Sequence, residues 1–588
     1  MIWLSVIILP LLAALLTSRY PSGRRNAGPI FVLASLPAVG LGLAEVPGIT
    51  LDWFILGTQF SLDTPRRIIL LLTGILWASS GLFSGTYLKD DIRRGSFNFY
   101  FGGAMAGNFG LLITEDAASF YTFFALMTFA SYGLVIHSQT AAARKAAKTY
   151  LVMAIIGELF IISALFLAVQ SAGSMLLSDL PPALANASNG PFIFLLGLIG
   201  FGVKVGAIPL YFWLPLAHPA APVPASAVLS GAMIKAGLIG WMHLAPVGLV
   251  DWPSLSVMMI SLGFTAALGA VIIGLLQVDP KTNLAYSSIS QMGLMTAFLG
   301  IGLYGGIPGS LLLPAIALYA FNHGTAKALL FLGTALPGKV GGYWRILMWL
   351  GLGLAVLAIA GGPLTGGLWT KYLLKTFLSK TSLPGIDVFA YLLTLSAITT
   401  TLLLSRFLHL LRQVESPKES KAPSFILPWF FLFLAGGWWT MSPTLLPEGL
   451  MYQILGEKGM MAFFWNPITI WASLWPIILT AGALVVVFTL KSSFLNRWIK
   501  EKPLIPPGDF LYVILWIGNL FEKQIQKVIA FMQSLGESRH SAEKIIYKFI
   551  DNKKTIHIST QAESLLRRWE VVGISFFVFF VALFFLLR

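Results

Sequence analysis

The segment FIFLLGLIGFGVKVGAIPLYFW, residues 192–213, is almost wholly apolar and carries a single charge, Lys204. A helix needs about 20 apolar residues to cross the hydrocarbon core of a bilayer. Runs of this kind recur along the 588-residue chain, at approximately 2–17, 29–46, 66–87, 99–114, 116–137, 149–170, 192–213, 221–245, 253–277, 285–304, 309–334, 343–379, 386–411, 423–441, 467–490 and 571–588. We therefore predict an all-α polytopic membrane protein with about 16 transmembrane helices.

The composition excludes the soluble classes of protein. Hydrophobic residues make up 57% of the chain and charged residues 11%, whereas a soluble domain carries about 25% charged residues. A soluble enzyme, a nucleic-acid-binding protein and a disordered scaffold are therefore excluded, and we expect no nucleic-acid partner. The 39 Lys and Arg against 24 Asp and Glu give a net charge of +15, which is typical of a membrane protein with basic cytoplasmic loops.

The sequence contains no cysteine. It therefore offers no thiolate ligand to zinc or to an iron–sulfur cluster, and it can form no disulfide. We predict no metal and no cofactor in this chain, and we expect any redox chemistry to take place in partner chains.

Basic residues gather in every second predicted loop. These loops contain Arg19, Arg24 and Arg25; Lys89, Arg93 and Arg94; Arg144, Lys145 and Lys148; Lys339 and Arg345; Arg412, Lys418 and Lys421; and Arg497, Lys500 and Lys502. Because Lys and Arg are enriched on the cytoplasmic side, we predict a multi-pass protein of the inner (cytoplasmic) cell membrane with both termini outside. The first apolar run precedes its basic residues, so we expect a retained helix rather than a cleaved signal peptide. The pair Arg66 and Arg67 is the exception, because it is predicted to lie outside.

Glycine and proline interrupt two of the predicted helices. The interruptions are the run from Gly206 to Pro224, which includes Pro209 and Pro215, and the tripeptide Gly361, Gly362 and Pro363. Broken helices at membrane depth occur where the freed backbone is buried in protein or lines a wet cavity. Two breaks in corresponding positions of two halves indicate a transporter with inverted repeats.

The C-terminal part of the chain has a different pattern. Between Phe510 and Trp569 the sequence is polar and periodic, and one helical face carries Phe521, Ile525, Val528, Met532 and Leu535. This pattern predicts an amphipathic helix, followed by a last transmembrane helix. The amphipathic helix either lies on the cytoplasmic surface or forms a lateral arm that crosses neighbouring subunits.

Ionisable side chains inside the predicted helices are the candidate functional residues. A charge at the bilayer centre costs at least ~2.5–3.5 kcal/mol, so such residues are rare without a role. The candidates are Lys204, Lys235, Lys327, Lys371, Glu158 and His323, with His218, His243, Ser287, Ser288, Ser290 and Gln291 as supporting polar residues. Amines removed from water, a carboxylate and imidazoles suit a proton relay. A Na⁺ site would need several oxygen ligands, and one intramembrane glutamate supplies few.

Four segments resemble one family of membrane proteins. They are GVKVGAIPLYFWLPLAHPAAPVPASAVLSGAMIKAG (202–237), LAYSSISQMG (284–293), FNHGTAKALLF (321–331) and GGPLTGGLWTKYLLK (361–375). They closely resemble the antiporter-like subunits of respiratory complex I, which are related to Mrp-type cation/proton antiporters and to energy-converting membrane-bound hydrogenases. The resemblance runs from about residue 100 to residue 410.

The resemblance implies two inverted five-helix repeats, each with a broken helix that carries a key lysine. Lys204 and Lys371 match the lysines of the two broken helices, Lys235 matches the lysine of the helix after the first, and Lys327 with His323 matches the central site. The expected domains are N-terminal helices at 1–98, repeats at 99–245 and 246–412, C-terminal helices at 413–500, a lateral helix at 501–569 and a terminal helix at 570–588. The lateral helix resembles that of the distal subunit, and its residues 508–569 would contact other membrane subunits.

One position departs from the family pattern. Members carry a glutamate on the fifth span, but this chain reads FFALMTFASYGLV there, with Ala125 in its place. The usual partner of Lys204 is therefore missing. Either Glu158 on the next span takes over its role, or the first half-channel is modified or inactive.

Three functions remain open on the sequence alone. The favoured one is a proton-translocating subunit of a redox-driven membrane complex, without a redox site of its own. The second is a subunit of a multi-subunit Na⁺/H⁺ antiporter of the Mrp type. The third is a structural subunit of the membrane arm that does not conduct ions.

Overall fold

The computed structural model describes residues 1–381, 385–414, 423–441, 465–489 and 505–509. Its long helices are α1 (Ile2–Arg19), α3 (Ala27–Leu43), α4 (Thr64–Tyr87), α5 (Arg94–Ile113), α6 (Ala117–Val135), α7 (Ala141–Ala172), α9 (Gly190–Val205), α12 (Ile234–Leu244), α13 (Pro253–Leu275), α14 (Pro280–Gly302), α15 (Gly309–Gly333), α16 (Tyr343–Ala360), α17 (Gly366–Lys380), α18 (Ile386–Arg412), α19 (Pro423–Met441) and α22 (Pro467–Thr489). Shorter helices are α2 (Pro21–Arg25), α8 (Leu180–Asn186), α10 (Leu214–Ala220) and α11 (Val223–Val228). The predicted lateral helix, apart from residues 505–509, and the predicted terminal helix lie outside the described residues.

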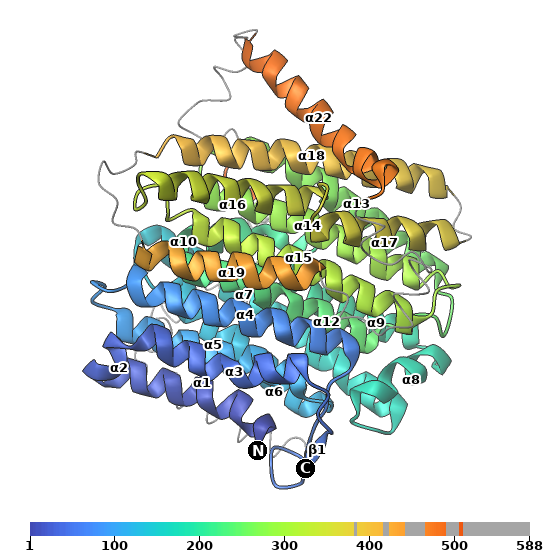
Figure 1. Cartoon of the computed structure of the whole chain (residues 1–588). Helices are drawn as coiled ribbons and strands as arrows, with labels where there is room; N and C mark the ends of the chain where they lie inside the picture. The colour runs from blue at the N-terminus through green and yellow to red at the C-terminus, as the bar shows by residue number, and fades with distance from the viewer. Residues whose placement is uncertain (382–384, 415–422, 442–464, 490–504, 510–588) are drawn as a thin grey trace, which may run out of the picture. The chain divides into compact units, whose positions relative to one another are not determined.

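The described part of the chain is an integral membrane fold. Eleven of its helices are long and apolar enough to cross a membrane. The neighbours α4, α5, α14 and α15 run side by side in Figure 1. The prediction of an all-α chain misses one small feature, because β1 (Ile49–Leu51) and β2 (Thr58–Phe60) form an antiparallel hairpin before α4.

The helices differ in what surrounds them. The apolar windows of α14 and of the segment Val223–Leu244 are completely buried, whereas α1 and α16 bury 39% of theirs. Large apolar side chains are exposed on the outer helices, for example Leu159 of α7 and Ile272 of α13. The helices that carry most of the polar candidates are therefore enclosed by helices with apolar outer faces, an arrangement that suits a lipid environment.

Both predicted interruptions coincide with helix ends. α9 ends at Val205, where Gly206 has a φ of +77° and its N–H donates to the carbonyl of Gly202. The chain continues through a 3₁₀ turn at Leu210–Trp213 into α10, which has Pro215 in its first turn. α16 ends at Ala360, and Gly361 adopts a φ of +86° before α17 begins at Gly366. Gly362 and Pro363 lie in this second gap, and Pro209 lies in the first.

A π-helical turn precedes Lys235, and the sequence pattern did not predict it. Residues Leu229–Met233 form this turn between α11 and α12. A π turn widens the helix by one residue and is frequent at functional sites. It leaves the carbonyl of Ser230 able to accept a hydrogen bond from the ammonium of Lys235 at 2.7 Å.

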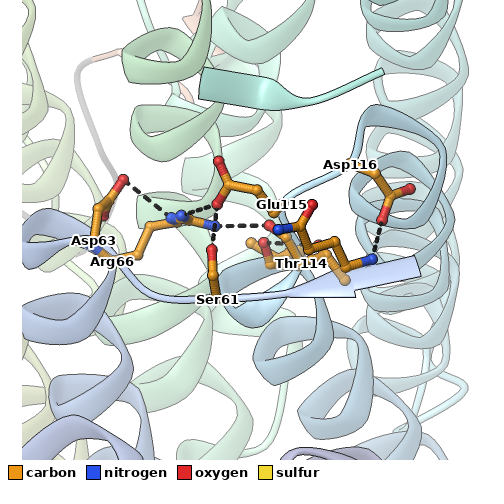
Figure 2. Close-up of polar contacts among 8 residues, drawn as sticks. Ser61, Asp63, Arg66, Thr114, Glu115 and Asp116 are labelled. Atoms are coloured by element: carbon orange, nitrogen blue, oxygen red, sulfur yellow. Dashed lines mark hydrogen bonds and ion pairs between the residues drawn. The ribbon is translucent and has the colours of Figure 1, made fainter. Parts of the chain in front are cut away.

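The exceptional arginines are neutralised by carboxylates. Figure 2 shows Arg66 between Asp63 and Glu115, with its guanidinium also donating to the carbonyl of Thr114 at 2.7 Å. Arg66 is 2% exposed, and Ser61 donates to Glu115 at 2.6 Å. Arg67 pairs at 2.6 Å with Glu45, whose side chain is exposed. The pair therefore belongs to a local ion-pair cluster, which explains why it departs from the charge pattern of the loops.

We predict that Glu115→Gln strongly destabilises the protein. The substitution leaves the buried guanidinium of Arg66 without its better-buried carboxylate, and breaking a buried pair costs about 3–5 kcal/mol. The matched change Glu45→Gln breaks an exposed pair, for which about 0–1 kcal/mol is expected. Thermal unfolding of the purified protein in detergent measures both, and equal midpoints for the two variants would contradict a structural role for the cluster.

The same cluster predicts a dependence of stability on pH. Burial alone would raise the pKa of Asp63, but the Arg66 guanidinium and its backbone N–H hold that pKa below the ordinary value. A lowered folded-state pKa stabilises the fold above the unfolded value, and this contribution is lost as the pH falls below about 4. Asp63→Asn should therefore flatten the loss of unfolding midpoint on acidification. The exposed carboxylate variant Asp52→Asn should leave the slope unchanged.

Candidate proton-relay site

Lys204 lies at the last turn of α9, just before the break. Its side chain is 5% exposed, and its Nζ donates to the hydroxyl oxygens of Tyr150 at 3.1 Å and Thr128 at 3.3 Å. The ammonium also lies 5.8 Å from the ring centre of Phe124. Two hydroxyl groups on α6 and α7 therefore solvate the amine in a place that water reaches poorly.

Glu158 of α7 faces the same small cavity as Lys204. The cavity is lined by Phe124, Thr128, Tyr150, Ala154, Gly157, Glu158, Ile161, Gly200, Val203, Lys204 and Trp213. It has room for about one water molecule. Glu158 is 6% exposed, and among the described residues neither carboxylate oxygen has a hydrogen-bond partner. A water between the carboxylate and the amine would satisfy both groups.

Ala125 is fully buried on α6, one turn before Thr128. A methyl group therefore occupies, inside the packed fold, the position at which the resemblance implied an acid. The oxygen atoms near Lys204 come instead from Thr128 and Tyr150, with Glu158 across the cavity.

Lys235 and His323 meet at the centre of the fold. Lys235 is fully buried on α12, and its Nζ lies 3.1 Å from Nδ1 of His323 on α15, which is 1% exposed. When Lys235 is protonated its ammonium can only donate, so that Nδ1 accepts and the proton of a neutral imidazole is on Nε2. That Nε2 is buried and has no hydrogen-bond partner among the described residues. The imidazole can therefore take a proton from one side and release one on the other.

Lys327 lies one turn after His323 and is also fully buried. Its Nζ donates to the carbonyl of Leu284 on α14 at 2.9 Å. Ser288 donates to the same carbonyl at 3.1 Å, and its hydroxyl is 2.7 Å from that of Ser230. Hydrogen bonds thus connect the lysines of the segment Val223–Leu244 and of α15 through α14. We call Lys235, His323 and Lys327 the central triad.

A second set of polar contacts joins α14, α15 and α18. Tyr319 donates to the side-chain oxygen of Gln291 at 2.6 Å, and the amide of Gln291 donates to Thr400 at 3.1 Å. Ser290 donates away from this set, to the carbonyl of Ala267 at 2.7 Å. The hydroxyl of Ser287 is buried without a partner in the described residues.

Lys371 lies just after the second break, in the first turns of α17. Its Nζ donates to the carbonyl of Ala360, the last residue of α16, at 2.7 Å. The amide of Asn322 on α15 donates to Ala358 at 3.3 Å in the same last turn. Lys371 is half-buried, in contrast to the other three lysines. An ammonium at a helix C-terminus complements the partial negative charge of the free carbonyls.

The two other candidate histidines, His218 and His243, lie in different parts of the fold. His218 of α10 is 1% exposed and stacks on Phe331, with ring centres 4.6 Å apart. His243 lies at the end of α12 against Phe120, near the cluster of Arg66. The structure therefore places His218 close to the central triad and His243 apart from it.

Sequence reasoning missed several neutral polar residues of the site, of which Thr128, Tyr150 and Ser230 contact lysines. Thr128, Tyr150, Ser230, Tyr319, Asn322 and Thr400 all make the contacts described above. The available signal was a hydroxyl or amide group inside an apolar run, which is common in membrane helices and therefore weak. In the described part of the chain no group of three or more His, Asp or Glu side chains is arranged to hold a metal ion.

A known protein family matches the part of the chain that contains this site. Residues 114–399 match the family described as NADH:quinone oxidoreductase/Mrp antiporter, transmembrane region. The match includes Lys204, the central triad and Lys371, so every lysine of the candidate site lies in the antiporter region.

Two proteins illustrate the similarity in sequence. Hydrogenase-4 component B of Escherichia coli K12 is 32% identical, over 46% of this chain and 42% of that protein. Na⁺/H⁺ antiporter subunit A1 of Staphylococcus aureus MRSA252 is 29% identical, over 58% of this chain and 46% of that protein. The chain thus spans less than two thirds of the length of these relatives.

Two solved structures share the fold. A chain of the Mrp complex from Dietzia sp. DQ12-45-1b aligns with a TM-score of 0.71 at 21% identity, over 95% of this chain and 62% of that one. A chain of an archaeal respiratory membrane complex, the membrane-bound sulfane sulfur reductase, aligns with a TM-score of 0.61 at 20% identity, over 74% of this chain and 95% of that one. The chain therefore shares its fold with these two chains and is similar in sequence to subunits named for hydrogenase and Mrp-type antiporter complexes.

Proposed function

We propose that this chain is a proton-translocating, antiporter-like subunit of a redox-driven, multi-subunit membrane complex. It moves H⁺ through a row formed by Glu158, Lys204, the central triad and Lys371. The observation that supports this most strongly is the contact between Lys235 and His323. Two titratable groups that are at most 1% exposed lie 3.1 Å apart, on different helices. Packing alone gives no reason to bury them, because each costs free energy to desolvate.

Proton transfer along the row follows from the hydrogen bonds. A proton on Nζ of Lys235 passes to Nδ1 of His323, and the imidazole releases its other proton from Nε2. Lys327, one turn away on α15, repels a second positive charge in the same enclosed space. Repulsion between positive charges therefore limits how many protons the central triad can hold at one time. A proton that arrives on one group of the triad favours the release of a proton from another.

The redox-driven reading draws on the relatives. Hydrogenase-4 component B and the sulfane sulfur reductase are named as parts of a hydrogenase and of a respiratory membrane complex. Because this chain has no cysteine, the electron carriers would be in partner chains. The membrane partners would be further antiporter-like and small transmembrane subunits, contacted through residues 508–569, which lie outside the described residues apart from 508 and 509.

The alternative is a subunit of a multi-subunit Mrp-type Na⁺/H⁺ antiporter. The alignment with the Dietzia Mrp complex, over 95% of this chain, favours it. Purifying the tagged chain with its partners separates the two functions. Hydrogenase-like or quinone-reductase-like subunits support the first, and small antiporter subunits without a redox protein support the second.

A subunit that does not conduct ions is a further alternative, favoured by the alanine at position 125.

Within the proposed function, residues 99–245 and 246–412 are the two inverted repeats. Both termini lie on the outer side of the inner membrane. The coupling ion is H⁺ rather than Na⁺. These features rest on the sequence patterns and on the resemblance.

We predict that Lys371→Ala reduces proton transport by the assembled complex about tenfold or more, which is within the range for removal of a proton-transferring group. The matched control is Lys375→Ala, one turn further along α17, because Lys375 is exposed. Proton uptake into membrane vesicles that contain the complete complex is the measurement. Unchanged transport in Lys371→Ala would remove Lys371 from the row, and normal transport in every lysine variant would leave the non-conducting function.

A further inference from the structure

Lys281 is a charged residue at the start of α14 that the relay described above does not use. It is half-buried, and its Nζ donates to the carbonyl of Ala221 at 2.7 Å. Ala221 is the C-cap residue that directly follows α10. Asp279, also half-buried, caps α14 by accepting from the N–H of Thr282 at 2.7 Å. Lys281 therefore joins the broken segment after α9 to the first turn of α14, at a place that solvent reaches.

One face of α14 leads from Lys281 to the central triad. Lys281, Leu284 and Ser288 are three and four residues apart, so they share a helical face. The carbonyl of Leu284 accepts from Lys327, and the hydroxyl of Ser288 lies 2.7 Å from Ser230. The seven helical steps from residue 281 to residue 288 span about 10 Å along the helix axis. The edge of the fold and the buried lysines are thus two turns of one helix apart.

His218 supplies a titratable group beside this face. It interacts electrostatically with Lys281, Lys327 and Lys235. Both ring nitrogens are buried and have no hydrogen-bond partner among the described residues. Buried polar atoms in folded proteins are nearly always satisfied by protein or by water. An imidazole with two open nitrogens among three amines therefore has two positions at which a bound water could be held.

We propose that Lys281 and His218 form the entry through which protons reach the central triad from the membrane face at which α14 begins. This inference rests on the proposed function and deepens it. The ammonium of Lys281 gives its proton through water to one ring nitrogen of His218. The other ring nitrogen releases a proton to Nζ of Lys327, which accepts it as a neutral amine, and Lys281 takes a new proton from the bulk. No electron is transferred: Lys327 passes its proton on into the triad, and the imidazole of His218 turns its ring so that its unprotonated nitrogen again faces Lys281.

The competing role for Lys281 is purely structural. A cation that donates to the last carbonyl of a helix stabilises that helix end, and α10 could need no more than this. Arginine separates the two roles. Its guanidinium keeps the charge and the donors, but it does not release a proton at physiological pH. The titratable groups that interact with Lys281 are Asp279 and His218, and Lys281→Arg leaves both in place.

The test uses the complete complex in membrane vesicles. We expect Lys281→Arg and His218→Gln each to reduce proton transport about tenfold or more, with normal assembly and unchanged thermal unfolding. Lys148→Arg, at an exposed lysine of α7, is the matched control and should transport as the original protein does.

Full transport in Lys281→Arg would overturn the proposal that protons enter through Lys281, and would leave only the structural role. Impaired transport in Lys281→Met together with full transport in Lys281→Arg would support the structural role further. Full transport in His218→Gln would overturn the proposal as well. Failure of the proposed function looks different, because the unmodified complex would then move no protons, or Lys371→Ala would be fully active. Loss in Lys371→Ala with full activity in Lys281→Arg rejects the entry alone.

Discussion

Replacing Lys235 with methionine should nearly abolish proton transport, by about 10²-fold, because it removes a proton-transferring group from the contact with His323. Methionine keeps the length and the helix propensity of lysine, so the complex should still assemble. The substitution removes the 2.7 Å bond to Ser230 and the 3.1 Å contact with His323 together. Proton transport per turnover of the complex, measured in vesicles, checks the prediction.

Lys235→Arg is the informative companion variant. Arginine can still donate to the same two acceptors, but it holds its proton. A proton relay therefore predicts that both variants lose transport, whereas a packing role predicts that arginine restores it. Retention of transport in Lys235→Met would contradict any role for the central triad.

Glu158→Gln should reduce transport several-fold, because Glu158 is the one carboxylate that faces the cavity of Lys204. Glutamine has nearly the same shape and does not ionise, so the change removes the proton-accepting group without opening the packing. Lys204→Met should have a similar effect. Because the two residues act as a unit, the double variant should be no worse than either single one.

The same experiment decides what the alanine at position 125 means. If the first half-channel is inactive, Glu158→Gln will transport as the unmodified protein does, while Lys371→Ala still fails. The exposed carboxylate of Glu45 provides the control, Glu45→Gln, which should be active. Additive losses in the double variant would show that Glu158 and Lys204 lie on separate paths.

The hydropathy of the sequence and the positions of glycine and proline within its apolar runs predicted much of this fold. The predicted spans at 66–87, 253–277 and 309–334 lie within two residues of α4, α13 and α15 at each end. The breaks at Gly206 and Gly361 were predictable because a left-handed glycine ends a helix in a way that its local sequence reveals. The last predicted span and nearly all of the lateral helix lie outside the described residues, so they stay predictions.

Contacts between distant segments were not predictable. Arg66 pairs with Glu115, which is 49 residues away in the sequence. Its charge is therefore neutralised inside the fold, and the pattern of basic residues in the loops could not show this. Lys235 meets His323 across 88 residues, and one sequence contains no signal for that distance. The half-burial of Lys371 depends on which helices cover α17, which hydropathy cannot indicate. The roles of Thr128 and Tyr150 follow only from their distances to Lys204.

The account depends most on water reaching the buried lysines, and the chain offers a direct test because it has no native cysteine. Ser287 on α14 is fully buried and its hydroxyl has no partner in the described residues, whereas the equally buried Ser79 of α4 donates to its own helix at 2.9 Å. Single Ser287→Cys and Ser79→Cys variants of the complete complex would be treated with a small, charged, water-soluble thiol reagent. The account predicts that Cys at position 287 reacts and Cys at position 79 does not. Equal inertness of both positions, in a complex that is moving protons, would contradict it.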